Sequence, residues 1–488
     1  MNSKFAKNTF RLSLASAMVA LGTMTAAPVL AIPEPSYDPV RDVAPPDATP
    51  APALPMEQKY ECVSSVLLDE SNMKQVPANN VFQVRRLHDL AVGRGQTVAV
   101  IDSGVNPNPR LANLIGGGDY IMGGDGLQDC DHHGTLIAGI IAARPSGFPT
   151  DAKEWDAFVG VAPEAAILSI RQTSRAYEPS RPPRGYDALA KSASSIYSLA
   201  QGVRRAADMG ATVINMSVTS CFPAGTPVDD SALAGALYYA AVEKDVVLVS
   251  SAGNVGDSCK QNPGPSTATP GDVRGWETVE NISLPSMWDQ FVLSVGGTNL
   301  NGDPYVNTMG GPWVDVAAPA MNIVSLNPAR NPEREDSRME IVNAQIKEGQ
   351  PIPINGTSFS AAYVSGLAAL IREKYPNLTA NQVISRITDT AHTPDSTETE
   401  NLIGYGVVDP VAALTATVSA GPKVAQGVPA QGVSALPDAI KPDTLSRDVA
   451  VRTMGISVVV LFVLGIVGMA FTSVKYHKKS SASSTEQD

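Results

Sequence analysis

NGTSFSAAYVSGLAALI, residues 355–371, predicts a helix that is buried along most of its length. Asn355, Gly356 and Thr357 suit a tight turn at its start, and the residues after Ser358 are mostly small and apolar. The hydroxyl of Ser358 stands at the mouth of a helix that is otherwise typical of a buried core. Ser358 therefore indicates chemistry at the edge of a core.

Short apolar strands alternate with helical segments on the N-terminal side of this helix. We expect strands at 97–101, 166–170, 212–217 and 246–251, and helices at 192–210 and 231–245. The order strand, helix, strand predicts a mostly parallel sheet with helices on both faces. The predicted fold class is α/β, in a domain that spans residues 81–415.

The composition favours a folded protein that does not bind nucleic acid. Of the 488 residues, 43% are hydrophobic and 17% are charged, which is typical of a chain with a sizeable core. The net charge of −12 lacks the basic excess that a phosphate-binding protein needs.

The N-terminus predicts export. A basic start, the apolar run LSLASAMVALGTM and a small residue at Ala31 form the pattern of a signal peptide over residues 1–31, although an uncleaved anchor is the alternative. Residues 32–80 follow as an arm, and its stretch 32–55 is so rich in proline that we expect neither helix nor central strand there.

The C-terminus predicts a membrane anchor. After a linker at 416–450, residues 453–474 carry no charge and as a helix would be roughly 33 Å long, enough for a bilayer core. A buried core helix is the alternative. Lysines at 475, 478 and 479 place the tail, 475–488, in the cytoplasm and the preceding domain outside, as a single-pass protein of the cell membrane.

Four cysteines lie in the part that we expect to be exported: Cys62, Cys130, Cys221 and Cys259. An even number in an oxidising compartment indicates two disulfides, for which three pairings are possible. A zinc site is the alternative, but no spacing of cysteines and histidines supports it.

Three stretches carry candidate catalytic residues. VAVIDSGV ends a strand at Asp102, QDCDHHGTLIAGII places His133 before a helix, and the opening stretch holds Ser358. A serine hydroxyl becomes a nucleophile when a histidine takes its proton and a carboxylate orients that histidine. The order Asp, His, Ser and the absence of a G-x-S-x-G motif argue against a lipase or esterase.

These three stretches, in this order, resemble the signature motifs of the subtilisin-like serine proteases over roughly residues 90–415. The resemblance implies a subtilisin-like three-layer fold and a serine endopeptidase with protein or peptide substrates. It also implies that Asn254 in SSAGN supplies an oxyanion donor. The walls of the substrate cleft would then be Ser217, Val218 and Thr219 on one side and Ser251, Ala252 and Gly253 on the other. One departure is Leu136, where the family usually has a second histidine.

The whole layout resembles the mycosins, the membrane-anchored subtilases of type VII (ESX) secretion systems. This resemblance implies an association with the secretion membrane complex and an N-terminal arm that wraps the catalytic domain. It also implies the pairs Cys62–Cys130 and Cys221–Cys259. The alternative function is mainly structural, bracing the complex with proteolysis secondary.

The sequence leaves the roles of some residues near the motifs undecided. His132 adjoins His133, but the H-G-T motif selects His133 as the base and leaves His132 at the cleft edge. Asp129 and Asp131 either shape the histidine loop or are solvated acids. Asp119 and Asp125 lack the spacing of a calcium loop, so we predict no metal and no cofactor.

Overall fold

The computed structural model describes residues 32–68, 71, 73–146, 156–186, 188–256, 259–264, 272, 274–329, 340–392 and 400–424. The chain divides into two units, 1–428 and 429–488, and all described residues belong to the first. The predicted signal peptide, membrane helix and tail lie outside them. Within the described residues, no helix has the length and apolarity needed to cross a bilayer.

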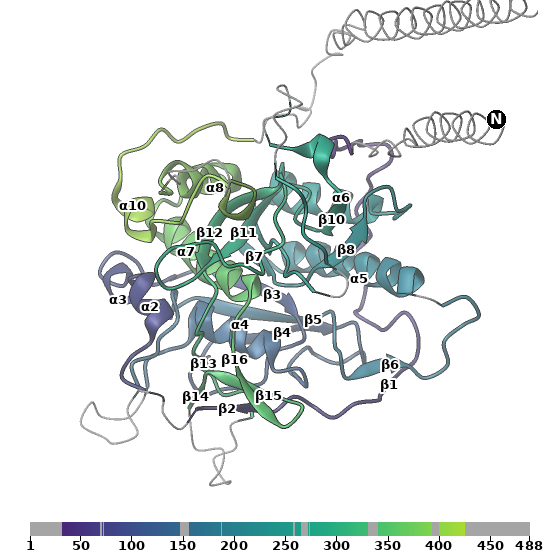
Figure 1. The fold of residues 1–488 in the computed structure, drawn as a ribbon, viewed down its shortest axis with the longest axis horizontal. Coiled ribbons are helices and arrows are strands. Elements are labelled where there is room, and N and C mark those ends of the chain that lie inside the picture. The colour runs from purple at the N-terminus through teal and green to yellow at the C-terminus, as the bar shows by residue number, and fades with distance from the viewer. Residues whose placement is uncertain are drawn as a thin grey trace, which may run out of the picture. The chain divides into compact units, whose positions relative to one another are not determined.

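A seven-stranded sheet forms the centre of the domain (Figure 1). Its order is β12 (Val314–Pro319), β11 (Val292–Thr298), β9 (Val247–Ser251), β7 (Val213–Met216), β3 (Thr97–Asp102), β5 (Ala166–Arg171) and β4 (Leu114–Asp119). Every neighbouring pair is parallel. The α/β class with a mostly parallel sheet is therefore confirmed.

Helices cover both faces of this sheet, so the fold has three layers. One apolar core includes residues of α2 (Pro77–Val81), α3 (Val84–Leu87), α4 (His133–Ala142), α7 (Thr357–Lys374), α8 (Ala380–Asp389) and α10 (Pro410–Thr415). The other core includes residues of α5 (Ala188–Asp208) and α6 (Ser231–Tyr238), and the short α9 (Glu400–Ile403) lies against β12. Residues 357–371 of α7 are all buried, as the sequence predicted.

The predicted helix at 231–245 ends earlier than its periodicity suggested. The α-helix stops at Tyr238 and continues as a π-helix, Tyr239–Glu243. There Lys244 N–H donates to Tyr239 O, a step of five residues instead of four. Because this widening falls in the last turn, few residues follow it, and a periodicity argument does not detect it.

Smaller antiparallel sheets form outside the central sheet. They are β1 (Met56–Gln58) with β6 (Tyr177–Pro179), β8 (Ser220–Pro223) with β10 (Asn281–Leu284), β13 (Ser325–Leu326) with β14 (Ile341–Val342), and β15 (Ala344–Lys347) between β16 (Gln350–Pro353) and β2 (Ser65–Val66). A short 3-10 helix covers Trp276–Thr278. In Figure 1, β2, β15 and β16 lie together at the bottom of the view.

The arm runs along the domain without helix or strand over residues 32–55. Tyr37 stacks on Tyr238 with ring centroids 4.1 Å apart. Farther along, the arm reaches the outer strand β4, where a Cβ on Gly118 would lie 2.2 Å from Pro50. The arm therefore covers an edge strand that would otherwise expose unpaired backbone groups.

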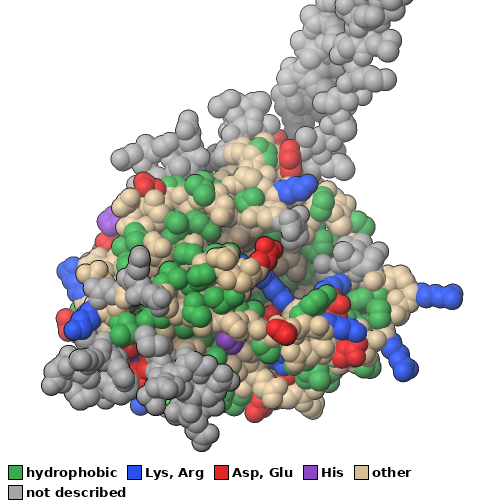
Figure 2. Space-filling view, turned by 60° about the horizontal axis from the view of Figure 1, so that its bottom comes forward, with side chains coloured by type: hydrophobic (Ala, Val, Ile, Leu, Met, Phe, Trp, Pro, Cys, Tyr) green, Lys and Arg blue, Asp and Glu red, His purple; other side chains and the backbone are tan. Residues whose placement is uncertain are grey.

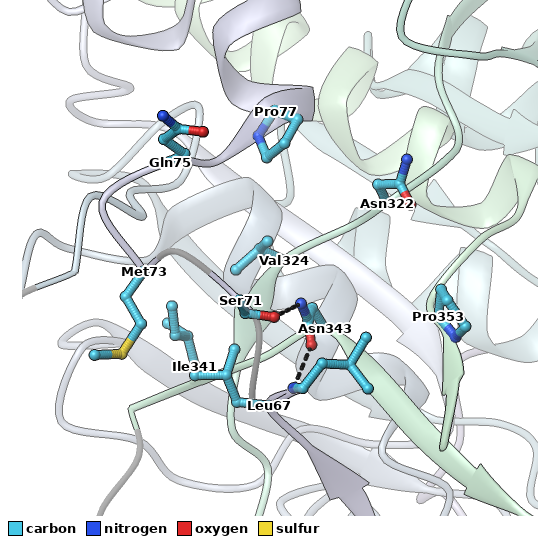
Figure 3. Close-up of a pocket in the computed structure, with 11 residues that line it drawn as sticks. Leu67, Ser71, Met73, Gln75, Pro77, Asn322, Val324, Ile341, Asn343 and Pro353 are labelled. Atoms are coloured by element: carbon cyan, nitrogen blue, oxygen red, sulfur yellow. Dashed lines mark hydrogen bonds between the residues drawn. The ribbon is translucent and has the colours of Figure 1, made fainter. Parts of the chain in front are cut away.

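Past β2 the arm packs against the loop that leads into β15 (Figure 3). Asn343 Nδ2 donates to Ser71 Oγ at 2.6 Å, and its Oδ1 accepts from Leu68 N–H at 3.0 Å. A cavity of about 210 Å³ lies beside these bonds, with Met73, Ile341 and other largely apolar side chains around it. One asparagine thus joins the arm to the rest of the domain across about 270 residues of sequence.

Candidate active site

A cleft of about 310 Å³ opens where β3 and β7 end. Its lining residues are Val63, Asp102, Ser103, Asp131, His133, Thr173, Ser174, Arg175, Ser217, Val218, Thr219, Asn254, Gln345, Ile346, Lys347 and Ser358. The side with β2 and β15 faces the viewer in Figure 2, where the surface is hollowed near its centre and acidic and basic side chains are interspersed. All three predicted triad residues and Asn254 therefore meet in one cleft.

Asp102 and His133 are hydrogen-bonded across 31 residues of sequence. Asp102 ends β3, and its side chain is 1% exposed. Its Oδ1 lies 2.7 Å from His133 Nδ1 and also accepts the Ser103 N–H at 2.7 Å. Because the bond occupies Nδ1, the other ring nitrogen of His133 is the one available to a reacting group.

Opposing effects act on the pKa of His133. Burial lowers it, but the nearby charge of Asp102 and the hydrogen bond to it raise it, and the net pKa lies above the ordinary 6.5. The protonated imidazole is the form that Asp102 stabilises. Through linkage, this contribution to stability is present below the unfolded pKa and is lost as pH rises through the folded pKa.

This shift leads to a prediction for the pH dependence of activity. The predicted role of His133 as general base requires the neutral ring, so kcat/KM should rise with pH as His133 loses its proton. Because its pKa is raised, the midpoint of this acid limb should lie above 6.5. Peptide hydrolysis measured from pH 5 to 10 checks this, and a midpoint clearly below 6.5 would contradict the stabilised imidazolium.

Ser358 lies in the first turn of α7 with 8% of its surface exposed. Gly356, two residues before Ser358, has φ 150° and ψ 155°. A residue with a side chain would be strained in this conformation, so the entry turn predicted at 355–357 depends on glycine. Ser358 Oγ donates to Ser217 O at 3.3 Å, and Ser217 Oγ donates to Ser358 O at 2.8 Å. This pair of bonds holds the start of α7 against the end of β7.

Asn254 is held by the same turn. Its Oδ1 accepts the Thr357 N–H at 3.0 Å, which leaves the amide N–H₂ of a cleft-lining side chain for another partner. The neighbouring Gly253 has φ 109°, which favours glycine, and its carbonyl accepts from Thr357 Oγ1 at 3.2 Å. The glycine and the bonds to Thr357 thus fix the Asn254 side chain beside the start of α7.

The two predicted substrate walls differ in the structure. Ser217, Val218 and Thr219 line the cleft. Ser251, Ala252 and Gly253 lie directly before Asn254, and their carbonyls accept bonds from Ser286, Ser283 and Thr357 inside the protein. None of these three is among the described residues that line the cleft, and their contact with substrate stays a prediction.

The arm reaches the cleft beside the histidine loop. Disulfides join Cys62 to Cys130 and Cys221 to Cys259, the pairs that the resemblance implied. Val63 N–H donates to Cys130 O at 2.8 Å, and Val63 itself lines the cleft. The first disulfide therefore fixes the arm next to the predicted base.

His132 does not lie at the cleft edge. It is buried, and its Nδ1 lies 2.9 Å from Ser65 Oγ in the arm. Burial lowers the pKa of His132 to about 4, so it stays neutral near pH 7. The expectation of a cleft-edge residue was wrong because β2 of the arm covers this histidine, a contact that the H-H-G-T sequence does not reveal.

Several cleft residues were not predicted individually. Thr173, Ser174 and Arg175 follow β5, and their place at the carboxyl end of a parallel strand could have indicated them. Gln345, Ile346 and Lys347 come from β15, which pairs with the distant β2. No local signal in the sequence announces that pairing.

The acids considered for calcium have other contacts. Asp119 is buried and pairs with Arg171 at 3.3 Å, while Asp125 is exposed and accepts the Leu127 N–H at 2.9 Å. Among the described residues, no three acidic, histidine or cysteine side chains converge as metal ligands would.

The layered parallel sheet and the cleft that gathers Asp102, His133, Asn254 and Ser358 are those of a subtilisin-type serine endopeptidase. Comparisons with known proteins narrow this class. The model of the subtilase family matches residues 93–406. Mycosin-1 of Mycobacterium tuberculosis is 47% identical over 411 residues, which cover 83% of this chain and 87% of that protein.

Solved structures of related proteins also resemble this chain. The crystal structure of MycP1 from Mycobacterium smegmatis is 41% identical with a TM-score of 0.75, covering 83% of this chain and 100% of that one. A chain of the intact ESX-5 inner membrane complex is 38% identical with a TM-score of 0.74, covering 90% of this chain and 100% of that one. The chain belongs to the subtilase family and, within it, to the mycosins.

Proposed function

We propose that Ser358, His133 and Asp102 form the catalytic triad of this endopeptidase. The observation that carries the proposal is the 2.7 Å bond between His133 Nδ1 and Asp102 Oδ1 in a cleft that also holds Ser358. Ser358 Oγ attacks the peptide carbonyl while His133 accepts its proton and later donates it to the leaving amine. Asp102 orients the ring and stabilises the imidazolium, and water then hydrolyses the acyl-enzyme.

Two donors would stabilise the oxyanion that forms during attack. The Ser358 N–H belongs to the first turn of α7, where helix N–H groups lack intrahelical acceptors and the helix dipole is positive. The amide N–H₂ of Asn254 is the second donor, because its oxygen is already bonded to Thr357 N–H. Fixed donors of this kind stabilise developing charge without reorganisation during the reaction.

Removing the amide donor should slow catalysis strongly. We expect Asn254→Ala to lower kcat by about 10² to 10³-fold, the range known for loss of such a donor in subtilisin. Asn254→Asp separates the two ends of the side chain, because it keeps an acceptor for Thr357 N–H and loses the donor. Both variants should remain folded, and peptidase assays should find similarly low kcat values for them. An aspartate variant with wild-type kcat would show that the amide does not serve the oxyanion.

The substrate of the proposed reaction is an extended peptide of an exported protein. Ser217, Val218 and Thr219 continue from the end of β7 along one wall of the cleft, and residues 173–175 lie on the β5 side. Between two such segments a peptide can pair through its backbone, a mode called β-augmentation. Side chains that line the cleft then select among sequences.

We place this activity outside the cytoplasm, in association with a type VII secretion membrane complex. The support is the likeness to the mycosins and to a chain of the intact ESX-5 inner membrane complex, together with the apolar stretch at 453–474. The topology proposed from the sequence is a signal peptide, an exported domain and a C-terminal helix. Protease added to spheroplasts should digest the domain and spare residues 475–488.

A structural role in the complex is the second candidate, and the same likeness to a chain of an assembled complex favours it. Proteolysis and bracing can be separated in cells. If Ser358→Ala stops substrate processing and leaves secretion intact, while deletion of the chain abolishes secretion, bracing is the main role. Loss of secretion in both strains would make proteolysis essential.

A further inference from the structure

Asp129, a buried acid outside the proposed triad, joins the segment that carries Asp102 to the segment that carries His133. Asp129 is 3% exposed, in the loop between β4 and α4. Its Oδ1 accepts from Ser103 Oγ at 2.8 Å. Its Oδ2 accepts from Thr135 N–H at 2.8 Å and from Thr135 Oγ1 at 2.6 Å. Ser103 follows Asp102, and Thr135 lies two residues after His133.

These bonds form part of a closed network. Ser103 Oγ accepts the Gly134 N–H at 2.9 Å. The residue that follows Asp102 is thus bonded to the residue that follows His133. Asn106 Nδ2 donates to Asp129 O at 3.1 Å, and Asn106 Oδ1 accepts the Asp129 N–H at 2.8 Å. Asn106 N–H also donates to Thr135 Oγ1 at 2.9 Å. The end of β3, the loop with Asp129 and the first turn of α4 are thus held as one unit.

Close backbone contact leaves this unit little freedom to adjust. A Cβ on Gly134 would lie 2.1 Å from Gly104 O. The loop after β3 and the start of α4 therefore touch with no side chain between them. Asp129 is the only described carboxylate that bonds to side chains of both segments.

Resting on the proposed triad, we infer that Asp129 is a positioning residue, which fixes the His133 ring against Asp102 through Ser103 and Thr135. It need not touch the substrate, because it is absent from the described residues that line the cleft. All three groups bonded to its side chain donate, which suits an ionised carboxylate that can only accept.

Its charge contributes as well as its geometry. The charged and titratable groups near it and His133 include Asp102 from β3, Asp131 and the buried His132 of the same loop, and Arg175, whose N–H donates to Asp131. Burial raises the pKa of Asp129 to about 7, against the effect of its hydrogen bonds. Its negative charge raises the pKa of His133, and Arg175 acts in the opposite direction. The ionised form of Asp129, which rising pH favours, supports the imidazolium.

The test compares Asp129→Asn with wild type in the full chain. The amide keeps the size of the side chain, removes the charge and turns one accepting end into a donor that faces donors. At pH 9 we expect kcat to fall between about tenfold and a hundredfold, as for one lost bond to a charged group, with KM within about twofold. The acid limb of kcat/KM should move to lower pH. The control Asp125→Asn alters an exposed acid of the same loop and should change neither kcat nor the position of the acid limb.

A second pair of variants applies if Asp129→Asn folds poorly. Thr135→Ser keeps the hydroxyl that bonds to Asp129, whereas Thr135→Val keeps the shape and loses it. We expect near wild-type kcat for serine and a loss of about tenfold for valine, with rates normalised to the folded fraction. Equal rates for the two, or an unmoved acid limb and kcat in Asp129→Asn, would overturn the inference. If wild type itself hydrolyses no peptide, the proposed triad fails instead.

Discussion

Ser358→Ala should lower kcat for peptide hydrolysis by about 10⁶-fold, as loss of the nucleophile does in subtilisin. The fold should persist, because Ser217 Oγ donates to the backbone carbonyl of residue 358, which the substitution keeps. The hydroxyl that is lost donates to Ser217 O at 3.3 Å, a long hydrogen bond. Residual hydrolysis should still exceed the uncatalysed rate by about 10³ to 10⁴-fold, because the proposed oxyanion donors remain.

The matched control is another buried hydroxyl of α7. Ser360 Oγ donates to Ala318 O at 2.9 Å and does not line the cleft. Ser360→Ala should therefore lower thermal stability by about 1 kcal/mol and leave kcat near wild type. If Ser358→Ala keeps more than a tenth of the wild-type kcat, another residue is the nucleophile.

Asp102→Ala should lower kcat by about 10⁴-fold, close to the value known for the corresponding loss in subtilisin. Asp102 Oδ1 bonds to both His133 Nδ1 and Ser103 N–H. Without it the ring loses its orientation and the charge that stabilises its protonated form. His133→Ala should be slower still, because the base itself is then absent.

Residues that act as a unit have non-additive effects. The double variant Asp102→Ala with Ser358→Ala should therefore be no slower than Ser358→Ala alone. Steady-state rates of the two single variants and the double variant check this. A loss of less than tenfold in Asp102→Ala, or losses that multiply in the double variant, would show that Asp102 does not work through His133 on Ser358.

The centre of the fold, and the meeting of Asp102, His133 and Ser358 in one cleft, could be predicted because both depend on local signals. TVAVID is a short run of β-branched residues that ends in a carboxylate, and the structure has β3 at Thr97–Asp102. The small apolar residues after Ser358 predicted a buried helix, and α7 is buried through residue 371. Parallel strands bring their carboxyl ends to one edge, so motifs far apart in sequence meet there.

Nonlocal pairing explains what the sequence did not predict. The cleft wall from β15 depends on Ala344 and Gln345 pairing with the arm at Val66 and Ser65. The burial of His132 depends on the same arm. From the sequence alone, Asp129 could either shape the histidine loop or be a solvated acid. Its hydrogen bonds to Ser103 and Thr135, which lie far apart in the sequence, show that it shapes the loop.

The triad is tested most directly by finding which residue reacts with a fluorophosphonate, a probe that modifies activated serine hydroxyls. Full-length protein should take up one probe molecule, and mapping of the labelled peptide should place it on Ser358. His133→Ala should abolish the labelling, since the hydroxyl then lacks its base. An adduct on another residue, or undiminished labelling of Ser358 in His133→Ala, would contradict a catalytic unit of Asp102, His133 and Ser358.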